Sequence, residues 1–184
     1  HYPLRRQRQM CIRDSSRIVS GKTGQLISIP VEGIYLLASL HEDYHSLENV
    51  FGNLGLAYQI TNDIKNLLGT DGAARQGGDV LRQSPNAVVI LFRDNLVNGS
   101  RQEFDEKFMQ GMVCEHTDEK WMHELVINGG ELAADKISSL LTEVEKDLND
   151  YEYDIKPVLL PVTDYLYAAS QKINRISSTS NAAR

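Results

Sequence analysis

The stretch Leu47–Leu68, LENVFGNLGLAYQITNDIKNLL, decides the fold of this 184-residue chain. Apolar residues recur in it at every third or fourth position, which is the repeat of an amphipathic helix. Gly69 follows directly, and a glycine just past the last periodic residue is a common helix stop. The stretch therefore predicts a long helix that ends at Leu68.

Helical spacing continues on both sides of this stretch. Upstream, Ile18–Leu40 is apolar at helical spacing, and Pro30 predicts a kink within it. Downstream, we expect further helices over Pro85–Leu96, Ser100–Gln110, Asp118–Asn128, Glu131–Tyr151 and Pro157–Ile173. Strand–helix alternation and internal repeats are not visible, so the sequence predicts an all-α fold.

The helix expected over 85–96 has marked boundary residues. Ser84 offers an N-cap and Pro85 suits the first helical position. Asn98 and Gly99 would end the helix. The run Ala87–Phe92 within it would suit a buried strand equally well.

Composition excludes several classes of protein. With 41% hydrophobic and 24% charged residues, the chain is expected to form one ordered domain. Its 19 Lys and Arg against 25 Asp and Glu argue against a general nucleic-acid binder. Apolar runs stay well short of the roughly 18 residues that span a bilayer. The two cysteines, Cys11 and Cys114, cannot form a disulfide framework. We therefore expect a soluble protein of the cytoplasm.

Both ends of the chain differ from the region between them. Residues 1–14 lack helical and strand periodicity, and the string Arg5–Asp14 looks like translated sequencing-adapter DNA. We expect 1–14 to be non-native and upstream sequence to be missing; the alternative is a basic arm for RNA or anionic lipid. The helical domain is expected over 18–173, and the polar tail 174–184 is expected to be disordered.

The first stretch with residues suited to chemistry is Gly21-Lys22-Thr23-Gly24. It combines a cation and a hydroxyl with glycines that allow close backbone approach, so it could hold a phosphate. It lacks the upstream glycine and strand of a P-loop. A solvated lysine at a helix end is the alternative.

The second stretch lies on the predicted helix Leu47–Leu68. Four polar residues share one face there through spacings of three and four: Gln59, Asn62, Asp63 and Asn66. Such an oxygen-rich face could present ligands to Mg²⁺, which takes carboxylates together with substrate phosphate oxygens. A polar solvated face is the alternative, and Lys65 in its middle supports that interpretation.

Taken in order, these stretches resemble the trans-isoprenyl diphosphate synthases, or polyprenyl synthetases. The matching segments correspond to that family's KT motif, its FQ-type pair, its second aspartate-rich DDxxD motif and its GxD segment: KTGQL at 22–26, LGLAYQI at 54–60, NDIKN at 62–66 and GD at 78–79. The resemblance is strong from Ile18 to Leu96 and looser beyond. It covers roughly the C-terminal half of such an enzyme.

The resemblance implies a reaction and its cofactor. Family members form an all-α bundle, the isoprenoid-synthase type, and condense an allylic diphosphate with isopentenyl diphosphate. Two aspartate-rich helices hold Mg²⁺ ions on the allylic diphosphate and help it to leave. Members would pair as a homodimer, or as a heterodimer with another prenyl synthase chain.

The resemblance also implies roles for individual residues. Thr23 and Gln59 would line the reaction centre as catalytic residues. The diphosphate would be bound by Lys22, with Arg75 and Arg82 as the cations nearest to family lysines that are missing here. The metal ligands would be Asp63, Asn62 and Asn66.

The departures from the family leave the function open. The segment upstream of Ile18 does not supply the first aspartate-rich motif, and in the second motif Asn62 and Asn66 replace carboxylates. At about 4 Å and an effective dielectric near 20, each lost charge pair is worth about 4 kcal/mol. Two alternatives are therefore open: a fragment of an active elongase, and a non-catalytic subunit with a catalytic partner. A class I terpene cyclase is the third alternative, but Asn66 and Thr70 do not supply its hydroxyl and acid.

Overall fold

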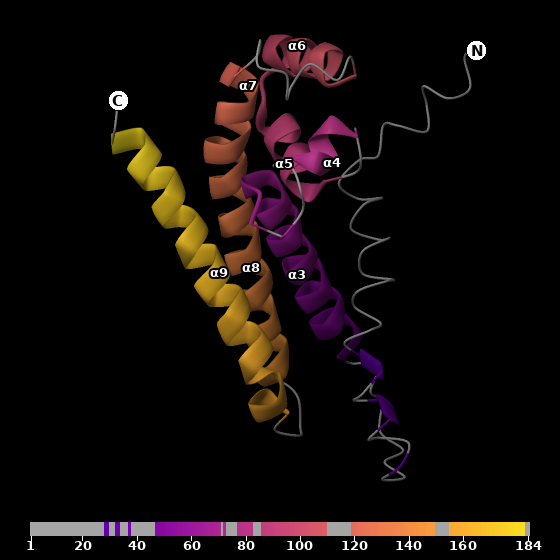
Figure 1. The fold of residues 1–184 in the computed structure, drawn as a ribbon. Coiled ribbons are helices and arrows are strands. Elements are labelled where there is room, and N and C mark those ends of the chain that lie inside the picture. The colour runs from indigo at the N-terminus through magenta and orange to yellow at the C-terminus, as the bar shows by residue number, and fades with distance from the viewer. Residues whose placement is uncertain are drawn as a thin grey trace, which may run out of the picture.

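The computed structural model describes residues 28–29, 32–33, 37, 47–70, 72, 77–82, 86–109, 119–149 and 155–182. Within these ranges every regular element is a helix, so the all-α prediction is confirmed (Figure 1). The elements are α3 (Glu48–Leu68), α4 (Gly78–Leu81), α5 (Ala87–Asn95), α6 (Asn98–Met109), α7 (Glu119–Glu124), the π-helical turn η5 (Leu125–Gly129), α8 (Gly130–Asn149) and α9 (Lys156–Ala182).

Helix α3 is the long helix that the sequence predicted. Gly69 follows it in the left-handed conformation, with φ of 69°, and its N–H donates to the Asn66 carbonyl at 3.1 Å. A side chain would be strained at such a positive φ, which explains the glycine. The buried face carries apolar residues at helical spacing: Val50, Phe51, Leu54, Ala57, Ile60, Ile64 and Leu67.

Helix α8 packs along both α3 and α9, and these three helices form the main body of the structure (Figure 1). Its buried face repeats every three or four residues: Ala133, Ala134, Ile137, Leu140, Leu141, Val144 and Leu148. Helix α9 buries one residue every three or four positions, namely Leu159, Thr163, Leu166, Ser170 and Ile173. This is the narrow stripe of a helix that covers the bundle from one side.

A second part of the core lies where α5, α6, α7 and η5 meet. The rings of Phe92, Phe104 and Trp121 pack edge to face, with centroids 5.3 to 6.3 Å apart. At Gly129 of η5 an added Cβ would lie 3.0 Å from Cγ1 of Val88. The glycine therefore allows α5 to approach η5 closely.

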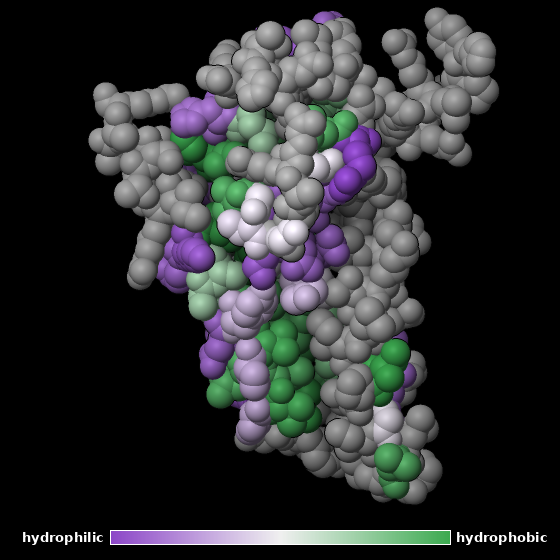
Figure 2. All heavy atoms as spheres, viewed as in Figure 1, coloured by the Kyte–Doolittle hydropathy of each residue, from purple (hydrophilic) through white to green (hydrophobic). Residues whose placement is uncertain are grey.

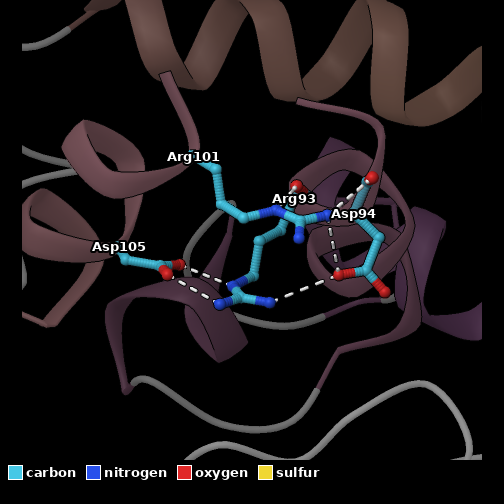
Figure 3. Close-up of polar contacts among 4 residues, drawn as sticks. All are labelled: Arg93, Asp94, Arg101 and Asp105. Atoms are coloured by element: carbon cyan, nitrogen blue, oxygen red, sulfur yellow. Dashed lines mark hydrogen bonds and ion pairs between the residues drawn. The ribbon is translucent and has the colours of Figure 1, made fainter. Parts of the chain in front are cut away.

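An ionic network joins the end of α5 to α6 (Figure 3). The Arg93 guanidinium binds both carboxylate oxygens of Asp105, at 2.5 and 2.7 Å, and this hydrogen bonding raises the pKa of Arg93. Arg101 donates to the carbonyl oxygens of Arg93 and Asp94 at 3.1 and 2.7 Å. These carbonyls end α5, and a cation at a helix C-terminus also favours the helix dipole.

The predicted boundaries of α5 were wrong at both ends. Asn86, rather than Ser84, is the N-cap, because its side-chain oxygen accepts from the N–H groups of Val88 and Val89 at 3.0 and 3.2 Å. The helix ends at Asn95. The predicted stop at Asn98 is instead the start of α6. The run 87–92, which suited a strand or a helix, is helical.

Further along the chain, the helix boundaries differ from the prediction at two places. The gap expected between Asn128 and Glu131 is absent, because η5 continues directly into α8. Helix α9 extends beyond Ile173 as far as Ala182, so most of the predicted tail 174–184 is helical. The segment 1–14 and Pro30 lie outside the described residues.

The surface of the bundle is mixed in polarity. Figure 2 shows hydrophobic residues exposed in the lower half of the view, where α3, α8 and α9 lie in Figure 1. On α9, Val158 and Leu160 are 63% and 54% exposed. Among the residues that the structure describes, no helix combines the length with the apolar character needed to cross a bilayer.

Candidate functional site

The structure describes five of the eight residues expected to form the site: Gln59, Asn62, Asp63, Asn66 and Arg82. The other three, Lys22, Thr23 and Arg75, lie outside the described residues. The described part of the candidate site is therefore the second half of α3 with the two short helices that follow it.

Asp63 is buried where α3 meets the beginning of α5. Its side-chain atoms accept two hydrogen bonds: Oδ1 from Nε2 of Gln59 at 2.7 Å, and Oδ2 from the backbone N–H of Ala87 at 2.6 Å. The residue is only 5% exposed. Both carboxylate oxygens are thus engaged inside the protein.

Burial also changes the acidity of this group. It raises the pKa of the Asp63 carboxyl from its ordinary value of 3.8 to about 6. The hydrogen bonds from Ala87 and Gln59 act in the opposite direction, and the negative charge of Asp79 adds to the rise. The loss of hydration therefore outweighs the stabilisation of the charged form.

Asn86 completes the contact between α3 and α5. Its Nδ2 donates to the backbone carbonyl of Asp63 at 3.4 Å, while its Oδ1 caps Val88 and Val89. The first N–H groups of a helix have no acceptor within the helix, and the helix N-terminus attracts negative charge. Asp63 and Asn86 supply both the acceptors and the charge.

Asn66, one turn further along α3, has the same relationship to α4. Its side-chain Oδ1 accepts the backbone N–H of Asp79 at 3.0 Å, and its carbonyl accepts the N–H of Gly77 at 2.9 Å. Gly77 has a φ of 66°, which a glycine adopts without strain. Asn66 therefore orders the turn that leads into α4.

The structure brings Asp79 into the site, although it was not among the expected site residues. Its charge acts on Asp63, and its carboxylate forms an ion pair with Arg82 at 3.1 Å. The only sequence signal for Asp79 was its place in the GD segment after the aspartate-rich motif. Arg82 is largely exposed and joins the site through this ion pair.

The outer edge of the motif contacts α9. The ammonium of Lys65 hydrogen-bonds to the hydroxyl of Tyr165 and lies 5.0 Å from the centre of that ring. The ring of Tyr58 lies 6.4 Å from the same tyrosine. Lys65 is therefore not simply solvated. Since Asn62 lies three residues before Lys65, both residues lie on the side of α3 that α9 contacts. Sequence spacing gave no indication of Tyr165.

The arrangement of the expected ligands can be compared with the needs of Mg²⁺, which requires several oxygen atoms converging on one point. Among the described residues no group of three His, Cys, Asp or Glu side chains could hold a metal ion. The oxygens of Asp63 face Gln59 and Ala87, and that of Asn66 faces the Asp79 amide. The side-chain oxygens of Asp63 and Asn66 therefore do not converge on one point in this arrangement.

The helical bundle, with its polar residues on α3, defines the class of the molecule as an all-α protein. The family model for polyprenyl synthetase matches residues 3–125, more than half of the chain, including all of α3 to α7. The chain therefore belongs to the polyprenyl synthetase family, and its fold is of the isoprenoid-synthase type. The comparisons with curated proteins and with solved structures gave no match.

Proposed function

We propose that this chain is part of a Mg²⁺-dependent polyprenyl diphosphate synthase, which condenses an allylic diphosphate with isopentenyl diphosphate. The family match over 3–125 carries the proposal. The family consists of prenyltransferases, and the KT, YQ and GD segments stand in this sequence in the family's order. Of the expected metal ligands, Asn62 is proposed as the one that this helix offers to Mg²⁺, because the side-chain oxygens of Asp63 and Asn66 are hydrogen-bonded inside the protein.

The proposed roles follow the chemistry of the substrates. Lys22 binds the allylic diphosphate, since negative charge grows on this group as it leaves and must be neutralised. Thr23 and Gln59 line the reaction centre. Arg75 and Arg82 are further cations for the diphosphate, and Arg82 would have to exchange its partner Asp79 for the substrate.

A partner chain is part of the proposal. These 184 residues carry one aspartate-rich motif, whereas the reaction needs two facing walls of a cavity. The second wall would come from a segment joined to this chain or from another prenyl synthase chain. Exposed apolar residues on α9, such as Val158 and Leu160, are suited to such a contact.

One observation favours a second candidate, a non-catalytic subunit of a prenyl synthase. The side-chain oxygens of Asp63 and Asn66, which would have to face a metal, instead hydrogen-bond to Ala87 and Asp79. In such a subunit the motif would serve the fold, and a partner would perform the chemistry.

Elongation assays distinguish the two candidates. We expect no turnover of dimethylallyl or geranyl diphosphate by this chain alone, and turnover by its complex with a catalytic or complementary prenyl synthase chain. In the complex, Lys22→Ala should lower kcat/KM by about tenfold or more, because a charge-assisted phosphate contact is lost. Lys172→Ala, on an exposed position of α9, is the matched control.

The elongation assays have three possible results. Activity of the complex that falls with Lys22→Ala and Gln59→Ala supports a catalytic role for this chain. Full activity with both variants supports the non-catalytic subunit. Absence of turnover in every complex, with all chains folded, would contradict both candidates.

A further inference from the structure

The hydrogen bond between Gln59 and Asp63 determines which atom of the Gln59 amide can face a ligand. An ionised carboxylate only accepts hydrogen bonds, so the 2.7 Å contact between Asp63 Oδ1 and the Gln59 amide must be made by the amide NH₂ group. The amide oxygen Oε1 of Gln59 is then the atom directed away from Asp63. Towards a ligand, Gln59 would therefore act as an acceptor through Oε1.

Asp63 itself cannot turn to follow a change in Gln59. Its second oxygen, Oδ2, is bound to the N–H of Ala87 at 2.6 Å, the first residue of α5. Helix α5 is in turn held by Asn86, which donates to the Asp63 carbonyl, and by the close packing of Val88 against Gly129. The carboxylate thus has one orientation, imposed by a helix that is fixed at several points.

We propose that Asp63 is a positioning residue rather than a metal ligand: anchored by the N-terminus of α5, it fixes the amide of Gln59 with Oε1 towards the ligand. The assignment rests on the proposed function only in taking Gln59 as a residue of the reaction centre. Because Oε1 is an acceptor, a ligand group that carries a hydrogen-bond donor or a positive charge is favoured next to Gln59.

The two hydrogen bonds oppose a second role of this carboxylate as a metal ligand. A metal bound at Oδ1 would compete with the amide of Gln59 for that oxygen, and one bound at Oδ2 would compete with the buried N–H of Ala87. The 5% exposure of Asp63 leaves little room for a hydrated ion beside either oxygen.

The Asp63→Asn variant tests the assignment, because it keeps the shape of the side chain and removes its charge. With one oxygen on Ala87, the new amide would present its NH₂ group to Gln59. Two NH₂ groups cannot bond to each other, so Gln59 should rotate and turn Oε1 towards residue 63.

Nuclear magnetic resonance of the ¹⁵N-labelled chain reads this rotation directly. In the wild type, one side-chain N–H proton of Gln59 should be shifted downfield and exchange with solvent at least about tenfold more slowly than those of Gln102. Gln102 is a matched control, since it makes the same contact across four residues, to Glu106 at 3.2 Å, on an exposed surface. Gln59→Ala assigns the signal.

In Asp63→Asn the shifted Gln59 signal should be lost, while Asn62→Ala should keep it. A wild-type Gln59 amide that exchanges as fast as Gln102 would overturn the assignment, even if Asp63→Asn fails to fold. So would a signal unchanged in a folded Asp63→Asn chain.

Paramagnetic Mn²⁺, as a stand-in for Mg²⁺, provides the second arm. Stoichiometric Mn²⁺ should leave the amide signals of Ala87 and Gln59 sharp. Selective broadening of both, abolished by Asp63→Asn, would show that Asp63 binds metal and would refute the proposal. Neither arm depends on turnover, so failure of the proposed function would be seen separately, as a complex without activity.

Discussion

The carboxylate of Asp63 accepts the backbone N–H of Ala87 at 2.6 Å, across 24 positions of sequence. This contact joins the second half of α3 to the first residue of α5, and Asn86 reinforces it by donating to the Asp63 carbonyl. The segment that corresponds to the aspartate-rich motif of the family is thus also the place where α3 is bound to the start of α5. Function and stability are expected to be linked here.

Replacing Asp63 by alanine should destabilise the chain by about 2 kcal/mol at neutral pH. The Ala87 N–H would lose its acceptor in a buried place, which costs about 1–3 kcal/mol, while the relief of a buried charge offsets part of the loss. Urea unfolding measures the change. Asp135→Ala, at an exposed position of α8, is the control and should stay within about 0.5 kcal/mol of the wild type. Equal stability of the two variants would contradict this role of Asp63.

The raised pKa of Asp63 predicts how stability depends on pH. Between 3.8 and about 6 the folded chain binds the proton while the unfolded chain has released it. Raising the pH through this range therefore removes stability, by at most about 3 kcal/mol from this one group. Because other carboxylates have their own effects, the informative quantity is the wild type relative to Asp63→Asn, measured by urea unfolding at several pH values. The wild type should lose stability relative to the variant as the pH rises, and a parallel pair of curves would refute the prediction.

Long periodic segments were readable from the sequence because their pattern depends on neighbours three and four residues away. Helix α3, with its stop at Gly69, was predicted almost to the residue. The boundaries of α5 were not, since the side chain of Asn86 caps the start of the helix and Arg101 binds the carbonyls that end it. Such choices are made by contacts between elements, which spacing along one helix does not contain.

The candidate site shows the same limit. Helical spacing correctly placed Gln59, Asn62, Asp63 and Asn66 along one helix, α3. It could not reveal that the amides of Ala87 and Asp79 would occupy the side-chain oxygens of two of them. Those amides come from segments 13 and 24 residues further on, and their positions depend on the tertiary fold.

Even the smallest side chain at position 129 is expected to destabilise the fold. In Gly129→Ala the new Cβ would lie 3.0 Å from Val88 and 3.2 Å from Leu125, so α5 or η5 must shift. We expect a loss of about 1–3 kcal/mol, seen as a lower midpoint of thermal unfolding. Gly99→Ala, where nothing lies within 4 Å, should instead leave stability unchanged or raise it by about 0.5 kcal/mol. If Gly129→Ala were as stable as Gly99→Ala, η5 could shift to accept the new Cβ at little cost in free energy, and the prediction would be wrong.

The ionic network of Figure 3 should contribute more than an ordinary surface ion pair. Asp105→Ala removes both hydrogen bonds to Arg93, and we expect a loss of about 1–2 kcal/mol because the contact is bidentate and half-buried. The control is Glu103→Ala, which removes a single contact of 3.5 Å to Lys107 on the same helix. That variant should lose less than about 0.5 kcal/mol. Unfolding midpoints in urea compare the two, and equal losses would contradict a special role for the network.

The two asparagines of the motif should respond differently when a carboxylate is restored. In an active complex, Asn62→Asp should lower the Mg²⁺ concentration for half-maximal rate several-fold, because it adds a charge on the half-buried side of α3. Asn66→Asp should have less effect, since the oxygen at this position accepts the Asp79 N–H and is 8% exposed. Initial rates against Mg²⁺ concentration measure both variants, with the wild-type complex as reference. If Asn66→Asp produced the larger change, the hydrogen bond to Asp79 would have to open during the reaction. If neither variant altered the Mg²⁺ dependence, this wall of the cavity would not face the metal, and the chain would act as the non-catalytic partner.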